Sequence, residues 1–216
     1  MPRRYLQHCA LAKALDVIGD RWVLLLIREL LIGPKRFRDL REALPTMGTN
    51  LLSARLKQLK QAGVIGTQPL PGGNHYALTE RGQALEPLVL ELVRWGMPLL
   101  ASREKGSMSR LEWDTVAMRA VFDPKVAAGV SVAYQFEVGD EVIHAIVDDG
   151  ALRTGPGPAD GPDMTLATDR RTWTAITSGR LSLQDAVSAG RLRCDGSTSK
   201  LQHLAEIFAT RAVWKK

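Results

Sequence analysis

The sequence predicts two domains of different class, a mainly α N-terminal domain followed by an α+β C-terminal domain. Apolar residues recur at helical spacing through most of the first hundred positions, whereas the alternation typical of strands begins near residue 130. Between these patterns, residues 101–110 form a polar run of small residues without apolar periodicity, as expected of a linker. We therefore expect domains at 1–102 and 111–216, joined by a linker at 103–110.

Positive charge is concentrated in the first half of the chain. Residues 1–105 contain 16 Lys and Arg against 9 Asp and Glu, whereas residues 106–216 contain 13 against 14. Nucleic acid is therefore the first candidate partner of the basic half. The longest apolar stretch, residues 22–27, is far shorter than the roughly 20 residues that cross a bilayer, and no export signal is visible. We expect a cytoplasmic protein that does not enter membranes.

The first half contains the pattern of a helix-turn-helix. Apolar spacing predicts four helices, at Leu11 to Ile18, 21–31, 37–44 and 49–62. Residues 45–48 read as a tight turn before the last helix, whose core stripe is Leu52, Leu56 and Leu59. The opposite face of that helix is polar and basic, so the helix is the expected recognition helix.

A hairpin and a long helix follow the expected recognition helix. Residues 64–68 and 75–78 read as strands joined by a Gly- and Pro-rich loop at 69–74, which is the position of a wing. Thr79 is the expected N-cap of a helix that continues to about Leu100. One face of this helix is apolar and needs a partner surface, as in a dimer. Its apolar positions are Leu85, Leu88, Leu92, Trp95 and Leu99.

These segments resemble a known family. Cys9 and the runs LDVIGDRW (15–22), RFRDL (36–40), LSARLKQL (52–59) and YALTERG (76–82) occur in the order found in HxlR-type winged helix-turn-helix regulators of bacteria. The resemblance covers about the first hundred residues. It implies transcriptional repressors that bind palindromic operators as homodimers, with the first helix and the long helix forming the dimer. Gly48 and Thr49 stand where relatives often place an N-cap Ser, so the first-turn contacts of the recognition helix are expected to differ.

The side chains around the helix-turn-helix include the expected DNA contacts. Lys and Arg neutralise phosphates, while Asn and Lys on a recognition helix can read adenine and guanine in the major groove. Arg55 lies beside the core stripe, where an ion pair within the domain, for example with Asp39, competes with DNA contact. The expected DNA-contact residues are Lys35, Arg36, Arg38, Thr49, Asn50, Ser53, Ala54, Lys57, Asn74 and His75.

The second half reads as strands first and helices later, the order of an α+β layer. Residues 130–138 and 141–147 flank Gly139-Asp140 as a hairpin, and further strands are expected at 151–154, 164–168 and 191–194. Asp148 and Asp149 read as turn residues rather than as a catalytic pair. Helices are expected at 171–178, 182–189 and 197–209.

The runs PDMTL (162–166), GRLSLQDA (179–186) and GRLRCDG (190–196) resemble sterol-carrier-protein-type lipid-binding domains. This resemblance implies an apolar tunnel between sheet and helices that holds a small hydrophobic or lipid-like effector. Ordinary core packing is the alternative reading of every such apolar residue. The residues expected to line the tunnel are Val132, Tyr134, Phe136, Ile143, Ile146, Trp173, Ile176, Leu181, Val187, Leu204 and Phe208.

Cysteine and histidine usage restricts the remaining chemistry. Cys9 and Cys194 have no metal-ligand spacing, the four histidines are scattered, and no nucleophile, base and orienting group occur together. We therefore expect no enzyme, no metal and no cofactor. Cys9 is a candidate redox sensor whose thiol pKa is expected to be lowered by Arg3, Arg4 and His8, with an inert thiol as the alternative.

The sequence therefore predicts a homodimeric regulator that binds double-stranded operator DNA and a hydrophobic effector. The alternative is an intracellular lipid-binding or dimer-stabilising protein with weak, non-specific DNA contact.

Overall fold

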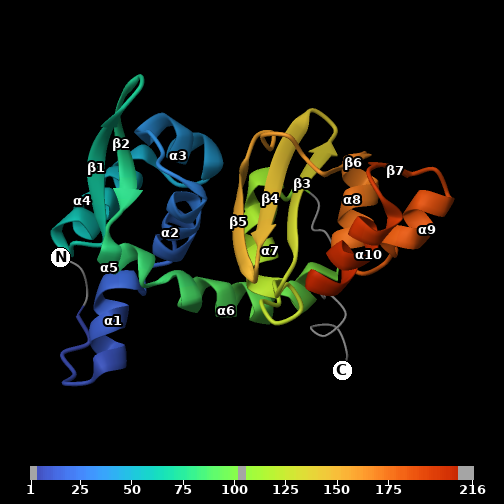
Figure 1. The fold of residues 1–216 in the computed structure, drawn as a ribbon. Coiled ribbons are helices and arrows are strands. Elements are labelled where there is room, and N and C mark those ends of the chain that lie inside the picture. Colours follow the sequence, from blue (N-terminus) through green and yellow to red (C-terminus); the bar gives the residue numbers. More distant parts are fainter. Residues whose placement is uncertain (1–3, 102–105, 209–216) are drawn as a thin grey trace. The chain divides into compact units, whose positions relative to one another are not determined.

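The computed structural model describes residues 4–101 and 106–208 of the chain. The chain forms two compact units, Met1–Val89 and Leu90–Lys216 (Figure 1). Part of the expected linker, residues 103–105, lies outside the described residues.

The N-terminal unit is a winged helix-turn-helix, as the sequence predicts. Its helix α2 is central, with Leu26 and Ile27 fully buried, and α4 buries Leu52, Leu56 and Leu59 as expected. Arg21 and Trp22 form a turn, so α2 begins two residues later than expected. The elements of this unit are α1 (Ala10–Ile18), α2 (Val23–Ile32), α3 (Phe37–Ala43), α4 (Thr49–Gln61), β1 (Ile65–Leu70), β2 (Gly73–Leu78) and α5 (Glu80–Gln83).

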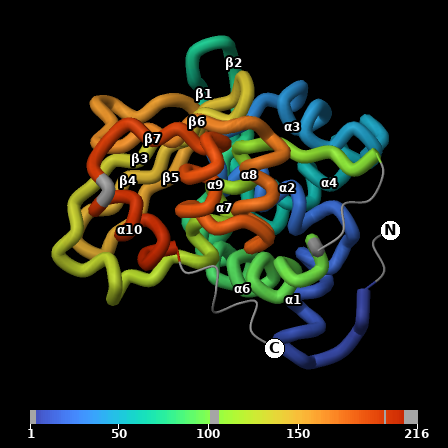
Figure 2. Tube along the Cα trace, turned by 90° about the vertical axis from the view of Figure 1, so that its right-hand side faces the viewer, coloured from blue at the N-terminus to red at the C-terminus, as the bar shows by residue number. Residues whose placement is uncertain are grey.

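The wing is longer and its turn tighter than the sequence predicts. β1 and β2 pair in antiparallel register from Ile65 opposite Leu78 to Leu70 opposite Gly73, so only Pro71 and Gly72 form the turn. The prediction of a loop at residues 69–74 is therefore wrong. Pro69 remains compatible with a strand because a two-stranded hairpin consists only of edge strands, where a missing N–H is tolerated. The tip of the hairpin extends away from the helices of its own unit (Figure 2).

The long helix expected from Thr79 to Leu100 is broken. Thr79 does cap α5, accepting a hydrogen bond from Gly82 N, but α5 ends at Gln83 and α6 spans Glu86–Gly96. The cause is Pro87, which has no N–H and whose ring clashes with a helical carbonyl four residues earlier, at Gln83. Beyond Gly96 the chain continues as the 3-10 helix η1 (Met97–Ala101), which contains Pro98.

The C-terminal unit is an α+β layer built on one five-stranded sheet. The sheet order is β5-β4-β3-β6-β7, with β3 parallel to β6 and every other neighbouring pair antiparallel. In Figure 1, α8, α9 and α10 lie near β6 and β7. The elements are η2 (Leu111–Trp113), α7 (Asp114–Val121), β3 (Ser131–Val138), β4 (Glu141–Asp148), β5 (Ala151–Pro156), β6 (Met164–Thr168), α8 (Arg170–Thr177), α9 (Leu183–Ser188), β7 (Leu192–Asp195) and α10 (Thr198–Ile207).

Every strand and helix expected in this half is present within about two residues, but η2 and α7 are additional. α7 packs against β4 and β5 and buries Val116, Met118 and Ala120. The turn interpretation is confirmed for Asp149, which adopts a positive φ of 44° and whose carboxylate accepts a hydrogen bond from Gly129 N, whereas Asp148 is the last residue of β4. The final residue of the expected last helix, Ala209, lies outside the described residues.

Candidate nucleic-acid interface

The outer face of α4 presents polar side chains to solvent. Thr49, Asn50, Ser53, Ala54 and Lys57 are exposed, as the helical wheel predicts. The Gly48 N-cap supplies no side-chain hydrogen bond, which leaves N–H groups of the first turn open to an external acceptor. An amide, two hydroxyls and an amine on one helix face are the groups that read base edges in a major groove.

Arg55 makes its contacts within the protein. Its guanidinium lies 2.8 Å from the Asp20 carboxylate and donates to Gln58 Oε1 at 2.6 Å. The expected ion pair within the domain is thus confirmed, with Asp20 instead of Asp39 as the acid. Asp39 has another role, because its carboxylate accepts the Arg36 backbone N–H at the start of α3.

Arg36 and His75 join α3 to the wing. Arg36 Nε donates to His75 Nε2 (3.2 Å), and Arg36 Nη2 donates to the Pro71 carbonyl (2.9 Å). His75 Nδ1 lies 2.9 Å from the Gly73 carbonyl. Because a guanidinium only donates and a carbonyl only accepts, this arrangement gives His75 Nε2 the acceptor role and Nδ1 the donor role. These two expected DNA contacts therefore hold the wing in place by hydrogen bonds within the protein.

Gly72 completes this attachment of the wing. Its φ is +85°, and a Cβ at this position would lie 1.6 Å from Arg36 Nη2. The positive φ favours glycine at this turn, and the guanidinium occupies the space that a side chain at residue 72 would need, so a substitution would displace Arg36 from Pro71 and His75.

The other basic residues near the wing differ in their surroundings. Lys35 pairs with Tyr76 through both backbone groups, N–H to carbonyl in each direction, and so adds a bridge to β2. Arg38 is exposed and lies 3.8 Å from Glu42 and 4.0 Å from Asp39. Exposed pairs of this kind contribute about 0–1 kcal/mol, so a phosphate can replace the carboxylates. Asn74 is exposed near the tip of the wing.

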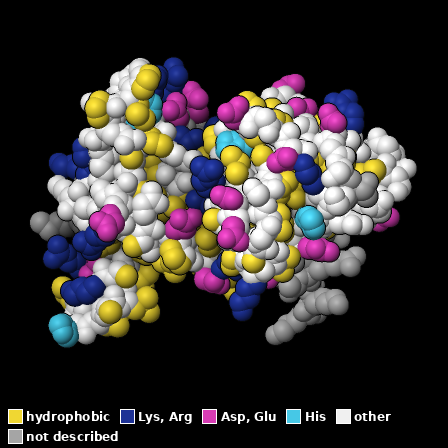
Figure 3. Space-filling view, in the orientation of Figure 1, with side chains coloured by type: hydrophobic (Ala, Val, Ile, Leu, Met, Phe, Trp, Pro, Cys, Tyr) yellow, Lys and Arg dark blue, Asp and Glu magenta, His cyan; other side chains and the backbone are white. Residues whose placement is uncertain are grey.

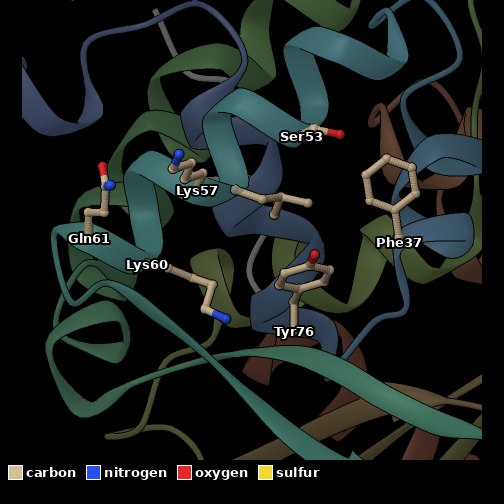
Figure 4. Close-up of a pocket in the computed structure, with 7 residues that line it drawn as sticks. Phe37, Ser53, Lys57, Lys60, Gln61 and Tyr76 are labelled. Atoms are coloured by element: carbon tan, nitrogen blue, oxygen red, sulfur yellow. The ribbon is translucent and has the colours of Figure 1, made fainter.

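A groove of about 490 Å³ lies between α4, the start of α3 and β2 (Figure 4). It contains Ser53 and Lys57, which were expected at the interface, together with residues that sequence reasoning missed. Tyr76 shares the wing strand with His75, and Lys60 follows Lys57 by three positions on α4, so strand and helix periodicity were the available signals. The lining residues are Phe37, Ser53, Leu56, Lys57, Lys60, Gln61 and Tyr76.

Cys9 is exposed at the N-cap of α1. The nearby backbone N–H groups of Ala12 and Leu11, in the first turn of α1, lower the pKa of its thiol, although the side chain forms no N-cap hydrogen bond. The N-terminus of α1 therefore lowers the pKa of Cys9, and the prediction that Arg4 and His8 lower it is wrong. Arg3 lies outside the described residues. Cys194 is different, since burial raises the pKa of its thiol.

Most residues expected to line a tunnel lie in the hydrophobic cluster of the C-terminal unit. The rings of Phe136 and Trp173 are 5.4 Å apart, and those of Tyr134 and Phe136 are 6.3 Å apart. Ile146 is the exception: it pairs with Ala133, whereas the neighbouring positions of β4, Ile143, Ala145 and Val147, belong to the cluster, so Ile146 faces the other side of the sheet. The expected lining residues within or against the cluster are Val132, Tyr134, Phe136, Ile143, Trp173, Ile176, Leu181, Val187, Leu204 and Phe208.

Two buried polar groups fasten helices to this cluster. The Tyr134 hydroxyl donates to the Lys200 carbonyl of α10 at 2.9 Å, and burial raises the pKa of Tyr134 to about 12. Trp173 Nε1 donates to the Asp114 carboxylate at 2.7 Å and so joins α8 to α7. Burial raises the pKa of Asp114 to about 6, although the indole hydrogen bond and the Arg170 charge act in the opposite direction.

Within residues 4–101 and 106–208, no helix combines the length and apolar content needed to span a membrane. The same residues contain no cluster of three or more His, Cys, Asp or Glu side chains that could hold a metal ion.

Comparison with known proteins gives a different match for each half. Residues 17–104 match the family model described as HxlR-like helix-turn-helix, and residues 110–214 match the model described as alkyl sulfatase C-terminal. The uncharacterised regulator YvaP of Bacillus subtilis is 38% identical over 38% of this chain and 80% of its own length. The uncharacterised regulator Rv3095 of Mycobacterium tuberculosis is 33% identical over 54% of this chain and 73% of its own.

A solved structure is also similar. The reduced form of the transcriptional regulator YodB from B. subtilis is 32% identical, covers 45% of this chain and 100% of its own, and has a TM-score of 0.38. The curated relatives are HTH-type transcriptional regulators, which are not enzymes. On the identity and coverage of these relatives, the chain belongs to the HxlR-like helix-turn-helix family of transcriptional regulators.

Proposed function

We propose that this chain is a repressor that acts in the bacterial cytoplasm and binds palindromic operator DNA as a homodimer. The observation that carries the proposal is the polar, exposed face of α4 beside a wing that Arg36 and His75 fix to α3. Asn50, Ser53 and Lys57 read bases, Thr49 and Ala54 add contacts in the first turns, and Lys35, Arg38 and Asn74 meet phosphates.

The dimer would bury apolar side chains that are exposed in the single chain. On the N-terminal segment and α1, Tyr5, Leu6 and Leu11 are more than half exposed, and hydrophobic atoms are visible over α1 in Figure 3. On α6, Trp95 is 74% exposed. Exposed apolar residues in this number are typical of a surface that another protein covers, and a second copy of the chain is the partner that the family favours.

The C-terminal unit, with functional boundaries at 111–216, would bind a hydrophobic effector in the manner of a sterol-carrier-like domain. Its single apolar cluster between sheet and helices supports this assignment, as does the match to a region of alkyl sulfatases, whose name denotes substrates with an alkyl chain. Effector binding would favour one separation of the two recognition helices, which must fit half-sites about 34 Å apart.

Cys9 supports a second sensing mode. Its thiol is exposed and its pKa is lowered by the N-terminus of α1, the two conditions that make a cysteine reactive towards oxidants. Since α1 belongs to the proposed dimer surface, modification of the thiol would alter operator affinity. Iodoacetamide treatment should change the affinity of the wild type and leave a Cys9→Ser variant unaffected. Equal affinities before and after treatment of the wild type would exclude this mode.

Selection of duplexes from a random library tests the function as a whole. Specific binding should reach a Kd of about 10⁻⁸ to 10⁻¹¹ M on selected duplexes, against about 10⁻⁴ to 10⁻⁶ M for charge alone. A protein that enriches no sequence would instead be the lipid-binding or dimer-stabilising alternative. Native mass spectrometry of the freshly purified protein then tests the sensing half, because a dimer with one apolar molecule per chain is expected.

A further inference from the structure

The groove between α4 and β2 contains donors and positive charge without protein partners. Among hydrogen bonds and ion pairs of the described residues, none uses the side chains of Ser53, Lys57, Lys60 or Tyr76. Its described lining residues include no Asp or Glu, and the buried Leu56 forms part of its floor. In Figure 4, Lys60 extends from α4 towards β2, and the Tyr76 hydroxyl points back towards α4. Two hydroxyls and two ammonium groups without a carboxylate suit an anion that only accepts hydrogen bonds.

The geometry of B-DNA indicates which anion this is. A major groove about 12 Å wide accepts a helix, and the adjacent minor groove is about 6 Å wide. One sugar-phosphate backbone separates these two grooves. A protein that places α4 in the major groove and its wing at the neighbouring minor groove must therefore have room for that backbone between helix and wing, where this groove lies.

We propose that Lys60 and Tyr76 bind a phosphate of the DNA strand that runs between α4 and the wing. This assignment rests on the proposed DNA binding and adds a site to it. Lys60 supplies charge, and Tyr76 supplies an O–H donor whose position is fixed, because its backbone is paired with Lys35 on one side and with Thr67 in β1 on the other. Contacts to phosphate carry no sequence information, so the pair sets affinity and register while Asn50 and its neighbours read the bases.

The test uses one duplex of 30 base pairs, selected with the wild-type protein, and the variants Lys60→Ala and Tyr76→Phe. Loss of one phosphate contact in each protomer by Lys60→Ala should lower the slope of log Kd against log salt by about 2 for the dimer, so the affinity difference shrinks roughly tenfold between 50 and 200 mM salt. Tyr76→Phe should weaken binding a few-fold on every sequence with the slope unchanged. Lys125→Ala, an exposed lysine of the C-terminal unit, is the matched control and should behave as the wild type.

Methylphosphonate substitution locates the contact. Phosphates are neutralised one at a time. At one position per half-site, the substitution should weaken binding of the wild type but should not weaken binding of Lys60→Ala any further. If the salt slope of Lys60→Ala equals that of the wild type, or if no phosphate position distinguishes the two proteins, the assignment is wrong although DNA binding stands. If the wild type enriches no duplex, the proposed function fails and the assignment with it.

Discussion

The two units of this protein place their polar side chains in opposite ways. On the outer face of α4 and in the adjoining groove, the side chains of Asn50, Ser53, Lys57, Lys60 and Tyr76 have no partners among the described residues, whereas in the C-terminal unit Tyr134 and Trp173 direct their polar groups inward to Lys200 and Asp114. An exposed polar group without a protein partner can bind a polar ligand without first breaking a contact within the protein. A buried polar group that is hydrogen-bonded to a helix holds that helix over the apolar side chains. Substitutions in the first set should therefore affect binding without affecting stability, and those in the second should do the reverse.

The largest effect on binding is expected for Asn50→Ala. Loss of one bidentate contact to adenine in each half-site should weaken binding to the selected operator by about 1–3 kcal/mol per contact, roughly 5- to 150-fold each, and relax the preference at one base position of each half-site. The melting temperature should not change, because Asn50 is exposed. Fluorescence anisotropy on the selected duplex and on single-base variants measures both effects, with exposed Gln83→Ala as the control. An unchanged preference would show that α4 is not the reading helix.

The attachment of the wing is an exception within the N-terminal unit, because the polar groups of Arg36 and His75 are paired with each other and with the wing backbone. Gly72→Val and Gly73→Val both place a side chain at a positive φ, of +85° and +119°, but only the Cβ at residue 72 collides with Arg36, while nothing lies within 4 Å at residue 73. We expect operator affinity to fall about tenfold more for Gly72→Val than for Gly73→Val, or about 1.4 kcal/mol. Equal losses would mean that strain alone matters and that Arg36 does not position the wing.

Asp114→Asn tests the inward polar groups. Folding raises the pKa of Asp114 from 3.8 to about 6, so the folded state binds the proton more tightly than the unfolded state. The contribution of Asp114 to the free energy of unfolding is therefore greatest below about pH 4, falls as the pH rises to about 6 and is constant above. Asn keeps an acceptor for Trp173 and removes the charge, so at pH 7 the variant should be more stable by about 1–2 kcal/mol.

Urea titrations of both proteins at pH 4, 5, 6 and 7 measure this difference. The gain in stability should disappear towards pH 4, and operator affinity at pH 7 should be unchanged. A variant that is less stable than the wild type at pH 7 would show that the carboxylate is required for more than its acceptor oxygen.

The smallest effect is expected for Arg38→Ala. Its carboxylate neighbours are exposed, so the free energy of unfolding should change by less than about 0.5 kcal/mol. Loss of one phosphate contact in each protomer should weaken binding several-fold on all sequences and lower the salt slope of the dimer by about 2. Isothermal titrations at three salt concentrations are sufficient. A slope equal to that of the wild type would leave Arg38 as a solvated surface charge.

The sequence predicted the elements with strong periodicity and missed those decided by long-range contacts. The face of α4 followed from its three buried leucines, and β3 and β4 from alternation around Gly139. Pro87 could have predicted the break between α5 and α6, because proline disrupts the interior of a helix. By contrast, the partner of Arg55 and the pairing of Arg36 with His75 depend on neighbours 35 and 39 residues away, which no local pattern contains. The face of Ile146 was available from strand alternation, because residues three positions apart on a strand, such as Ile143 and Ile146, lie on opposite faces of the sheet.

The place of α10 in the C-terminal unit has a consequence for synthesis of the chain. Asp123 N–H donates to the Ile207 carbonyl, and Leu201, Leu204 and Ile207 complete the hydrophobic cluster, so this core cannot close until the last described helix has left the ribosome. The compact N-terminal unit ends at Val89, within α6. Because domains generally fold in the order of their synthesis, the DNA-binding unit should be folded while the strands of the second unit still lack the helix that covers them. During that interval the nascent chain exposes apolar strands, and chaperone binding or a translational pause would act there.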